Sequence, residues 1–299
     1  MSELSILIVT WNSQGTIQGC LNSIQKNCHN LNYEVLAWDN VSTDDTVKTI
    51  QTEFPKVQLF KSPQNLGFAG GNNCLLEKAN SEFILFLNPD TLIMDNSVTK
   101  MLKYLKSNPS VVALGPKLLY SDSTFQLSYT KFPNLASEFF TKIYQRSANQ
   151  RRSLVLKFLE NSSAKTKEVD WISGACLMTR KKVLQETGKF DENFFLYFED
   201  ADLCHRLKSI GNIIYFPEAQ VVHAVGSSTK TQNLKTEYHY RKSQLYYYRL
   251  HNSWISNLIL KLYLSLKFGL GRIFSNKEKK DWYKHILGLI WSQNPKLEK

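Results

Sequence analysis

Apolar and polar positions follow two rhythms that take turns along the first half of the chain. Short apolar, β-branched runs occupy residues 5–10, 33–40, 57–60 and 83–87. Between them, apolar residues recur every three or four positions, as in residues 17–27, and this spacing predicts helices. A strand–helix alternation of this kind predicts an α/β fold with a mainly parallel central sheet that helices cover on both faces.

Polar residues follow three of these strands at the point where each apolar run stops. They are Trp11 and Asn12, Asp39 and Asn40, and Asn88, Pro89 and Asp90. The carboxyl ends of parallel strands meet at one edge of a sheet, and ligands bind outside that edge in open α/β sheets. The pattern therefore predicts a ligand-binding edge built from strand ends that are far apart in the sequence.

The second half of the chain is less regular. Residues 131–168 are polar with few clear signals, and within them residues 146–153 and 161–168 predict loops or mobile segments, whereas residues 169–184 predict a strand followed by a helix. An aromatic stretch then leads into a further helix, and residues 212–217 and 219–228 predict two more extended segments. Residues 237–274 are helix-like, aromatic and basic.

Composition places the chain among globular proteins. Hydrophobic residues make up 42% and charged residues 21% of the 299 positions, which is enough apolar material for a buried core. The five cysteines form no C-x-x-C pair, a pattern that favours reduced thiols in a cytosolic protein over a disulfide framework or a zinc site. The N-terminal residues lead straight into an apolar strand, so no signal peptide is expected.

The positive charge is concentrated at the C-terminal end. The formal net charge is +11; residues 230–299 hold 14 Lys and Arg against 4 Asp and Glu, whereas residues 1–229 hold 23 against 22. A nearly neutral body with a basic extension indicates a polyanionic partner, either nucleic acid or an anionic membrane. No uncharged run approaches the roughly 20 residues of a transmembrane helix. The extension suits a helix lying in a membrane interface, an interpretation that the concentration of charge favours over a helix packed on the body.

Asp90 follows the apolar strand at residues 83–87, where Pro89 prevents the ladder from continuing. One interpretation is a turn in which Asp90 caps a helix that starts near Asn96. The other is a carboxylate that binds a divalent cation together with a diphosphate, since Mg²⁺ takes most of its ligands from phosphate and water. His223, at the end of a later apolar run, is an acceptable further ligand if the fold brings it to Asp90.

A glycine-rich stretch at residues 65–73 and a later acidic cluster complete the candidate chemistry. The glycines are spaced G-x-x-G-G, which is neither the dinucleotide-binding G-x-G-x-x-G nor a P-loop, but lets backbone approach a ligand closely. Glu199, Asp200 and Asp202 begin a predicted helix. They either complement the helix dipole or supply a general base that deprotonates a hydroxyl, and the residues alone leave both interpretations open.

Seven segments together resemble the motifs of the inverting family-2 glycosyltransferases with the nucleotide-diphospho-sugar (GT-A) fold. They are VTWN, DNVSTDDT, NLGFAGGNN, LNPD, WISGACLM, FDENFFLYFEDADLCHRL and VVHAVGSS, in family order between residues 4 and 228. The likeness is greatest to the rhamnosyltransferase-like branch that builds bacterial surface polysaccharides. It implies a catalytic domain at residues 1–229, with a nucleotide-binding half to about residue 120 and an acceptor half beyond, and a membrane-associating extension at residues 230–299.

The resemblance also implies a role for each candidate residue. The nucleoside pocket would be lined by Thr10, Trp11, Asn12, Asp39 and Asn40, with Asp39 facing the base. The diphosphate and donor sugar would lie near Asn65, Gly67, Gly71, Asn72 and Asn88. The cation would be bound by Asp90 and His223. The acceptor would be bordered by Trp171, Ser173, Gly174 and Asp202. The catalytic base would be Asp200, with Glu199 as the second candidate.

The implied reaction is a single in-line displacement at the anomeric carbon. Asp200 would take the proton of the acceptor hydroxyl, with the departing diphosphate stabilised by Mn²⁺ or Mg²⁺, so that the configuration inverts. The donor would be dTDP-rhamnose or a UDP-sugar (galactose, glucose or N-acetylhexosamine), and the acceptor a lipid-linked glycan in cell-surface polysaccharide synthesis. We therefore expect a cytoplasmic protein, peripheral at the inner face of the plasma membrane, with no nucleic-acid partner. An oligomer is compatible with the sequence.

Two positions depart from the family pattern. Asn88 stands where many relatives have the first carboxylate of Asp-x-Asp, which lowers the negative charge of the cation site. Trp11 replaces the more usual Tyr and preserves a stacking surface. The Asn form is familiar in the rhamnosyltransferase-like branch, so we expect an active enzyme.

Two other functions compete with glycosyl transfer. A sugar-nucleotide nucleotidylyltransferase would need a glycine-rich and Arg/Lys-rich phosphate loop near the N-terminus, and VTWNSQG does not supply one. A non-catalytic protein that binds glycan or nucleic acid through its basic extension would leave the Asp90 and Asp200 clusters without a purpose.

Overall fold

The structure is a computed structural model that describes residues 2–149, 161–224, 234–273, 275 and 277–292. The strands of its central sheet are β1 (Leu4–Thr10), β2 (Tyr33–Asp39), β3 (Gln58–Lys61), β4 (Phe83–Leu87), β5 (Thr91–Ile93), β6 (Val111–Leu119), β7 (Phe125–Gln126), β9 (Lys167–Val169), β11 (Cys176–Arg180) and β12 (Asn212–His223). Two short strands, β8 (Tyr129–Thr130) and β10 (Trp171–Ile172), pair separately. The main path of the sheet runs β3-β2-β1-β4-β11-β6-β12-β5, with β7 beside β6 and β9 beside β12.

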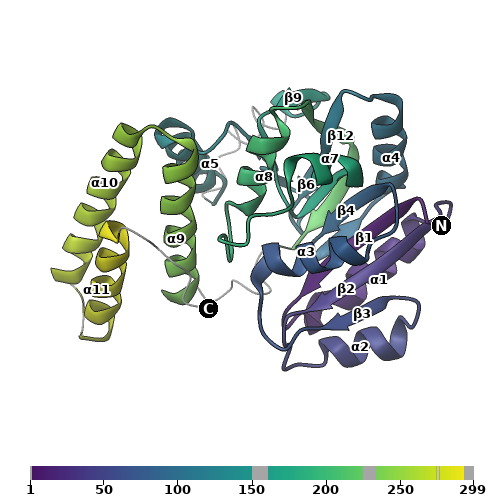
Figure 1. Cartoon of the computed structure of the whole chain (residues 1–299), viewed down its shortest axis with the longest axis horizontal. Helices are drawn as coiled ribbons and strands as arrows, with labels where there is room; N and C mark the ends of the chain where they lie inside the picture. The colour runs from purple at the N-terminus through teal and green to yellow at the C-terminus, as the bar shows by residue number, and fades with distance from the viewer. Residues whose placement is uncertain (1, 150–160, 225–233, 274, 276, 293–299) are drawn as a thin grey trace.

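Helices cover both faces of this sheet (Figure 1). The helices of the described residues are α1 (Gln14–Asn27), α2 (Thr46–Glu53), α3 (Gly67–Lys78), α4 (Ser97–Ser107), α5 (Leu135–Asn149), α7 (Lys181–Thr187), α8 (Glu199–Leu207), α9 (Leu234–His251), α10 (Trp254–Ile273) and α11 (Lys277–Trp291), of which the last three lie away from the sheet. Ile6 and Ile8 of β1 pack in the cluster formed with α1, α2 and α4, whereas Leu7 and Val9 pack in the cluster formed with α3. Because β1 is buried on both faces, the apolar run in its middle, Ile6 to Val9, is unbroken instead of alternating with polar residues.

The first four strands are parallel, as the strand–helix alternation predicts. β1 pairs in parallel with β2 and β4, and β2 pairs in parallel with β3. Beyond β4 the sheet is mixed: β11 lies antiparallel between β4 and β6, β12 runs parallel to β6, and β5 lies antiparallel to β12. The predicted ligand-binding edge therefore contains the ends of parallel strands and also the ends of antiparallel strands.

Three predicted segments differ from the observed elements. Residues 212–217 and 219–228 join in one strand, β12, which is irregular between Phe216 and Gln220; residues 225–228 lie outside the described range. α5 covers a stretch without clear sequence signals and includes residues 146–149 of a segment predicted as loop, and α3 begins within the glycine-rich stretch at Gly67. The loop prediction was wrong at residues 146–149, because packing against the rest of the protein overrides weak local propensity.

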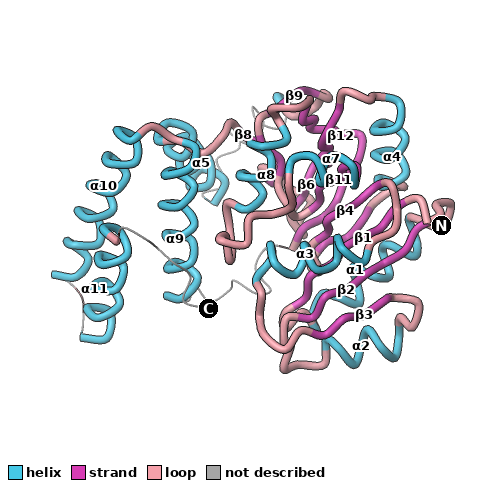
Figure 2. The backbone as a smooth tube through the Cα atoms, viewed as in Figure 1, coloured by secondary structure: helices cyan, strands magenta, loops and turns pink. Residues whose placement is uncertain are grey.

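Three C-terminal helices lie together at one end of the molecule, with α9 between the body and α10 (Figure 2). Phe194 and Phe198 of the body share an apolar cluster with Leu245 and Tyr247 of α9. The predicted domain boundary at residue 229 lies outside the described residues. Within the described ranges, no helix combines the length and apolarity needed to cross a membrane.

Candidate active site

A buried carboxylate ties together the ends of β1 and β2. Asp39 is 3% exposed, and its two oxygens accept hydrogen bonds from the Thr10 hydroxyl at 3.2 Å and the Ser42 backbone N–H at 3.0 Å. Asn12 adopts a left-handed conformation (φ 48°), and its side-chain oxygen accepts a 2.8 Å hydrogen bond from the loop after β2. These strand ends form a prearranged polar edge, beside which Trp11 is half exposed.

Asn40 fixes the start of α3 against this edge. Its side-chain amide donates to the Gly67 carbonyl at 2.9 Å and accepts from the Leu66 N–H at 3.1 Å. Asn65 Oδ1 accepts from the Gly67 N–H at 2.9 Å. Gly67 has a φ of 71°, and a Cβ there would lie 2.3 Å from the Phe195 carbonyl oxygen, so the position requires glycine. The start of α3 is thus held between the end of β2 and the aromatic segment before α8.

Gly71 serves helix packing in this structure. A Cβ at Gly71 would lie 2.9 Å from both Cγ atoms of Val9 and 3.1 Å from Trp38, so glycine lets α3 approach β1 and β2 closely. This close packing accounts for Gly71 without a ligand, and its contact with a donor stays a prediction. Asn72 beside it is buried; its amide donates to the Phe68 carbonyl at 3.0 Å, and its Oδ1 has no partner among the described residues.

The pairing of β5 with β12 brings Asp90 to His223. His223 lies opposite Thr91 in the antiparallel register. Its Nε2 is 3.2 Å from Asp90 Oδ1, and both side chains are largely buried. The fold thus brings His223 next to Asp90, which makes His223 a candidate ligand for a cation bound by Asp90. Asp90 does not cap α4, because Asn96 occupies the N-cap position.

Two amide side chains flank the imidazole of His223. Asn88 Nδ2 is 3.3 Å from His223 Nε2, and Gln126 Nε2 is 3.1 Å from His223 Nδ1. Gln126 lies on β7, the short strand that pairs with the end of β6. No sequence pattern marks Gln126, because a two-residue strand has no periodicity and its partner is distant along the chain.

The turn before β11 joins this edge to the second carboxylate centre. The Asn88 N–H donates to the Ala175 carbonyl at 2.9 Å. The neighbouring Gly174 N–H donates to Asp200 Oδ2 at 2.9 Å, and a Cβ at Gly174 would lie 3.5 Å from Phe68 of α3. The strand end that precedes Asp90, the start of α3 and Asp200 therefore meet around one turn.

Glu199 and Asp200 are adjacent carboxylates in different surroundings. Glu199 is 7% exposed with its Oε2 unpartnered among the described residues; burial, with repulsion from Asp200, raises its pKa well above the usual range. Burial also raises the pKa of Asp200, but hydrogen bonds from the Gly174 and Ala201 N–H groups at 2.9 and 2.8 Å oppose that rise. Asp200 is therefore the carboxylate that ionises first.

Two bulky residues immediately before α8 adopt left-handed conformations. Tyr197 and Phe198 have φ values of 69° and 68°, which are unfavourable for aromatic residues and are found most often at functional sites. α9 holds this segment in place: the Ser243 hydroxyl donates to the Leu196 carbonyl at 2.8 Å, and the Phe198 and Tyr247 ring centroids are 5.5 Å apart. The start of α8 thus depends on a helix of the C-terminal part.

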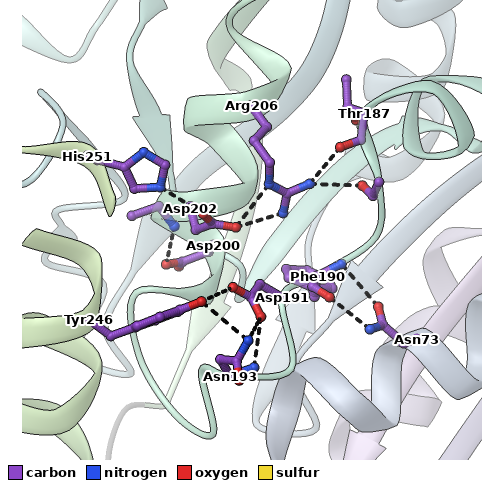
Figure 3. Close-up of polar contacts among 12 residues, drawn as sticks. Asn73, Thr187, Phe190, Asp191, Asn193, Asp200, Asp202, Arg206, Tyr246 and His251 are labelled. Atoms are coloured by element: carbon purple, nitrogen blue, oxygen red, sulfur yellow. Dashed lines mark hydrogen bonds and ion pairs between the residues drawn. The ribbon is translucent and has the colours of Figure 1, made fainter. Parts of the chain in front are cut away.

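Asp202 is buried in a charged network (Figure 3). Its Oδ2 accepts from Arg206 at 2.7 Å, and its Oδ1 lies 2.8 Å from His251 Nε2 on α9. Burial raises the pKa of Asp202, but the hydrogen bond from His251 and the Arg206 guanidinium outweigh burial and lower it. This network accounts for Asp202 structurally, and its contact with an acceptor stays a prediction. The ion pair between Asp202 and Arg206 could have been predicted from the sequence, because residues four apart on a helix lie side by side.

Other contacts in Figure 3 fix the segment before α8 from two sides. The Tyr246 hydroxyl of α9 donates to Asp191 Oδ2 at 2.8 Å. Asn73 of α3 donates to the Phe190 carbonyl at 2.9 Å and accepts from the Phe190 N–H at 3.1 Å. The aromatic segment is therefore clamped between α3 and α9.

The sequence of the chain matches a known protein family. The sequence model of glycosyl transferase family 2 matches residues 5–188, more than half of the 299-residue chain. The chain belongs to glycosyl transferase family 2. An N-acetylglucosaminyl-diphospho-decaprenol L-rhamnosyltransferase of Mycobacterium tuberculosis is 26% identical over 233 residues, 74% of this chain and 76% of that protein. Rhamnosyltransferase WbbL of Escherichia coli is 27% identical over 229 residues, 73% of this chain and 82% of that protein.

Solved structures show the same fold for this family 2 glycosyltransferase. Staphylococcus aureus TarS 1–349 in complex with UDP has a TM-score of 0.58 at 16% identity, covering 96% of this chain and 80% of TarS 1–349. The mannosyltransferase PcManGT of Pyrobaculum calidifontis, in complex with GDP-Man and Mn²⁺, has a TM-score of 0.56 at 14% identity, covering 98% of this chain and 88% of PcManGT. The fold is GT-A-like, with a mixed sheet and flanking helices, as the resemblance implied.

In this glycosyltransferase, Asp90 and His223 fit a divalent cation. A carboxylate oxygen and an imidazole nitrogen suit Mn²⁺, and Mg²⁺ uses few protein ligands beside phosphate and water. The described part of the chain contains no group of three or more His, Cys, Asp or Glu side chains placed to hold a metal. A cation at this edge would therefore have two ligands of these types and would depend on the nucleotide for others.

Trp171 and Ser173 border the Asp200 end of the edge. The Trp171 indole N–H is buried without a hydrogen-bond partner among the described residues, and it lies close enough to Asp200 to lower the pKa of that carboxyl. The Ser173 N–H donates to the Ser128 carbonyl at 2.9 Å, which anchors the turn. Their contacts with an acceptor stay predictions.

Proposed function

We propose that this glycosyltransferase moves a sugar from a nucleotide diphosphate to an acceptor hydroxyl with inversion of configuration. The observation that carries the proposal is the meeting of two carboxylate centres around one turn. Asp90 and His223 lie 3.2 Å apart on one side, and Asp200 is bound to Gly174 of the same turn on the other. A cation-binding pair and a base held at one edge meet the positioning needs of an in-line displacement.

Asp200 acts as the base that takes the acceptor proton. It is partly exposed and starts α8, where the helix dipole favours a negative charge. Glu199 does not compete as a covalent nucleophile, because it is buried and holds its proton more tightly. One working carboxylate supports a single displacement, and a single displacement inverts the anomeric centre.

Asp90 and His223 would hold Mn²⁺ or Mg²⁺ together with the donor diphosphate. The chemistry that such a cation would supply there is neutralisation of the negative charge that develops on the leaving diphosphate. Asn88 contributes no charge, so among Asp90, His223 and Asn88 only Asp90 supplies a formal negative charge. Cation binding should therefore strengthen when the nucleotide brings its own phosphates.

Rhamnose carried by dTDP is the proposed donor sugar. Its support comes from the mycobacterial and E. coli relatives, both of which are named rhamnosyltransferases. A UDP-sugar is the alternative, because a TarS structure of the same fold contains UDP. The residues proposed for the nucleotide pocket are Thr10, Trp11, Asn12, Asp39, Asn40, Asn65, Gly67, Asn72 and Asn88.

The proposed acceptor is a lipid-linked glycan, and an apolar face on α5 and α10 supports work at a membrane. Leu262 and Leu266 of α10 are 54% and 65% exposed, and Phe140 of α5 is 68% exposed. The Lys142 ammonium of α5 lies 5.5 Å from the Tyr263 ring of α10, so the two helices adjoin. The opposite side of α10 is buried in the C-terminal cluster. A helix that is apolar on both sides is expected to bury its exposed apolar side against a membrane or another protein surface.

The occupant that we propose for this face is the anionic inner leaflet of the plasma membrane. α10 carries three basic residues and no acidic one, and mixed basic and apolar surfaces bind anionic lipid interfaces. α9 packs on the catalytic body at residues 1–229 through Phe194 and Phe198, and α10, which carries the exposed leucines, is the proposed membrane-facing helix of residues 230–299.

The proposed reaction is tested with the full chain, a panel of nucleotide sugars and a lipid-linked N-acetylglucosamine acceptor. We expect transfer from dTDP-rhamnose in the presence of Mn²⁺, loss of transfer with a chelator, and an inverted anomeric configuration by NMR. Faster transfer from a UDP-sugar would replace the donor assignment. Retention of configuration would contradict the single displacement.

The membrane face is tested by sedimentation with phosphatidylglycerol vesicles and with phosphatidylcholine vesicles. We expect preferential binding to the anionic vesicles, lost in a Leu262→Ser, Leu266→Ser double variant. Ile210→Ser, at an exposed apolar residue of the body (47%), is the matched control and should bind like wild type. A dimer that the double variant dissociates, without vesicle binding by the wild type, would instead assign this face to a second copy of the chain.

A further inference from the structure

The imidazole of His223 has a polar neighbour at each ring nitrogen. Nδ1 is 3.1 Å from the side-chain amide of Gln126, whereas Nε2 is 3.2 Å from Asp90 Oδ1 and 3.3 Å from Asn88 Nδ2. A neutral imidazole carries one N–H and one lone pair, so the hydrogen bond at one nitrogen decides what the other nitrogen offers. The hydrogen bond between the Gln126 amide and Nδ1 therefore determines whether Nε2 presents a proton or a lone pair to Asp90.

Gln126 and His223 are placed by rigid strands on opposite sides of β6. Leu118 of β6 pairs with Gln126 of β7 on one side and with Val221 of β12 on the other. Side chains fixed by paired strands hold their geometry better than side chains on loops. The contact between the amide and the imidazole is thus built into the sheet.

Each orientation of the Gln126 amide matches one tautomer of His223. With the amide nitrogen toward Nδ1, the imidazole carries its proton on Nε2 and donates to Asp90. In that state the Nε2 proton also confronts the N–H of Asn88, and Gln126 Oε1 is buried without a partner among the described residues. With the amide turned over, Oε1 accepts from Nδ1–H, and the Nε2 lone pair is open to Asn88 or to a cation.

We infer that Gln126 is the positioning residue that sets the tautomer of His223: its amide oxygen accepts from Nδ1–H and so presents the Nε2 lone pair to the cation beside Asp90. The inference rests on the proposed cation site. Histidines that ligate metals donate their other N–H to such a partner, whose loss weakens metal binding by about 10- to 100-fold. An amide has a donor end and an acceptor end. Without a cation, the Gln126 amide nitrogen can therefore donate to Nδ1, while Nε2–H of His223 donates to Asp90.

The test measures cation binding directly. Mn²⁺ binding to the full chain, alone and with UDP, is followed by electron paramagnetic resonance. Gln126→Leu should weaken binding about 10- to 100-fold. Gln126→Glu should retain wild-type affinity, because its carboxylate also accepts from Nδ1–H. Gln185→Leu, at an exposed glutamine of α7, is the matched control and should bind like wild type.

A second readout reports the tautomer itself. In chain labelled with ¹⁵N-histidine, His223 should carry its proton on Nδ1 when Mg²⁺ and UDP are bound, and Gln126→Leu should lose that preference. Comparison with His223→Asn assigns the signal, and thermal unfolding confirms that each variant is folded.

Three outcomes separate the inference from the proposal beneath it. Equal Mn²⁺ affinity in Gln126→Leu and wild type, with binding lost in Asp90→Asn, would overturn the role of Gln126 and leave the cation site standing. Wild-type affinity in Asp90→Asn and His223→Asn would remove the site itself. Loss of binding in Gln126→Leu that Gln126→Glu does not restore would reduce the contact to packing and also overturn the inference.

Discussion

The two carboxylate centres of the active site are built in opposite ways. Asp90 lies at a sheet edge and faces an imidazole at 3.2 Å. Asp200 starts a helix beside a second carboxylate, and two backbone N–H groups hold its oxygens. The first arrangement collects ligands for a positive charge, whereas the second adjusts the proton affinity of one carboxylate through burial and hydrogen bonds. In the proposed reaction, one residue type would thus do different chemistry at the two ends of one displacement.

Removing the base should have the largest effect. Asp200→Asn keeps the shape and the contact with the Gly174 N–H but cannot take a proton at neutral pH. We expect turnover to fall by about 10³-fold, within the range for loss of a general base, while the Kd of the nucleotide sugar stays unchanged. Steady-state kinetics and calorimetry provide the two measurements. Wild-type turnover would remove Asp200 from the reaction.

Removing the charge of the other centre should have the next largest effect. Asp90→Asn should lower kcat/KM by roughly 10²-fold, because it removes the charged ligand from the cation site and about 3 kcal/mol of transition-state stabilisation. Nucleotide binding should lose its response to Mn²⁺. Asp95→Asn, which removes an exposed carboxylate from the following loop, is the matched control and should behave like wild type. Binding that never depended on Mn²⁺ would contradict a cation role for Asp90.

The pH profile should separate the two centres further. Burial raises the pKa of Asp200, so its carboxylate becomes protonated at a higher pH than an ordinary Asp, near 3.9. Below the raised pKa the base is occupied by a proton, and kcat/KM should fall about tenfold per pH unit. A rate profile between pH 4.5 and pH 9 provides the measurement. A flat profile down to pH 4.5 would show that Asp200 has no raised pKa in the free enzyme.

The smallest expected effect concerns stability. The pKa of Glu199 is raised in the folded state, so its contribution to stability is fully present below the unfolded pKa and is lost as pH rises through the folded pKa. Glu199→Gln removes this loss and should raise the Tm at pH 8 by a few degrees, at about 2–4 °C per kcal/mol, with little change at pH 4. Thermal unfolding at both pH values tests it. A lower Tm at pH 8 would show that the charged form is stabilised.

Local pattern predicted the parallel half of the fold well. The run at residues 83–87 coincides with β4, because a fully buried strand shows an unbroken apolar sequence. The same reasoning gave no helix for α5 and did not place the start of α3 within the glycine-rich stretch. Polar residues and glycines weaken the local signal there, and helix formation is decided by packing against distant parts of the chain.

The active site divides in the same manner. Asp90, His223 and the Glu199–Asp200 cluster could be picked out as candidates because carboxylates and an imidazole follow apolar runs, whereas the choice of Asp200 as base came from the family resemblance; their roles stay predictions. Gln126 and the brace from α9 could not, since neither has a local pattern. Gly71 gained a structural explanation that its spacing did not show, because a Cβ there would meet Val9 and Trp38 where α3 approaches β1 and β2; its contact with a donor stays a prediction.

The sequence by itself determined the order of strands and helices, the family resemblance and the residues able to do chemistry, because these depend on local periodicity and residue type. Only the tertiary structure decided that Asp90 meets His223, that Asp200 ionises before Glu199, and that α9 supports the segment before α8. The physical reason is that strand pairing, burial and backbone hydrogen bonds join residues far apart in the chain. Their energies depend on distance in space, which no local pattern records.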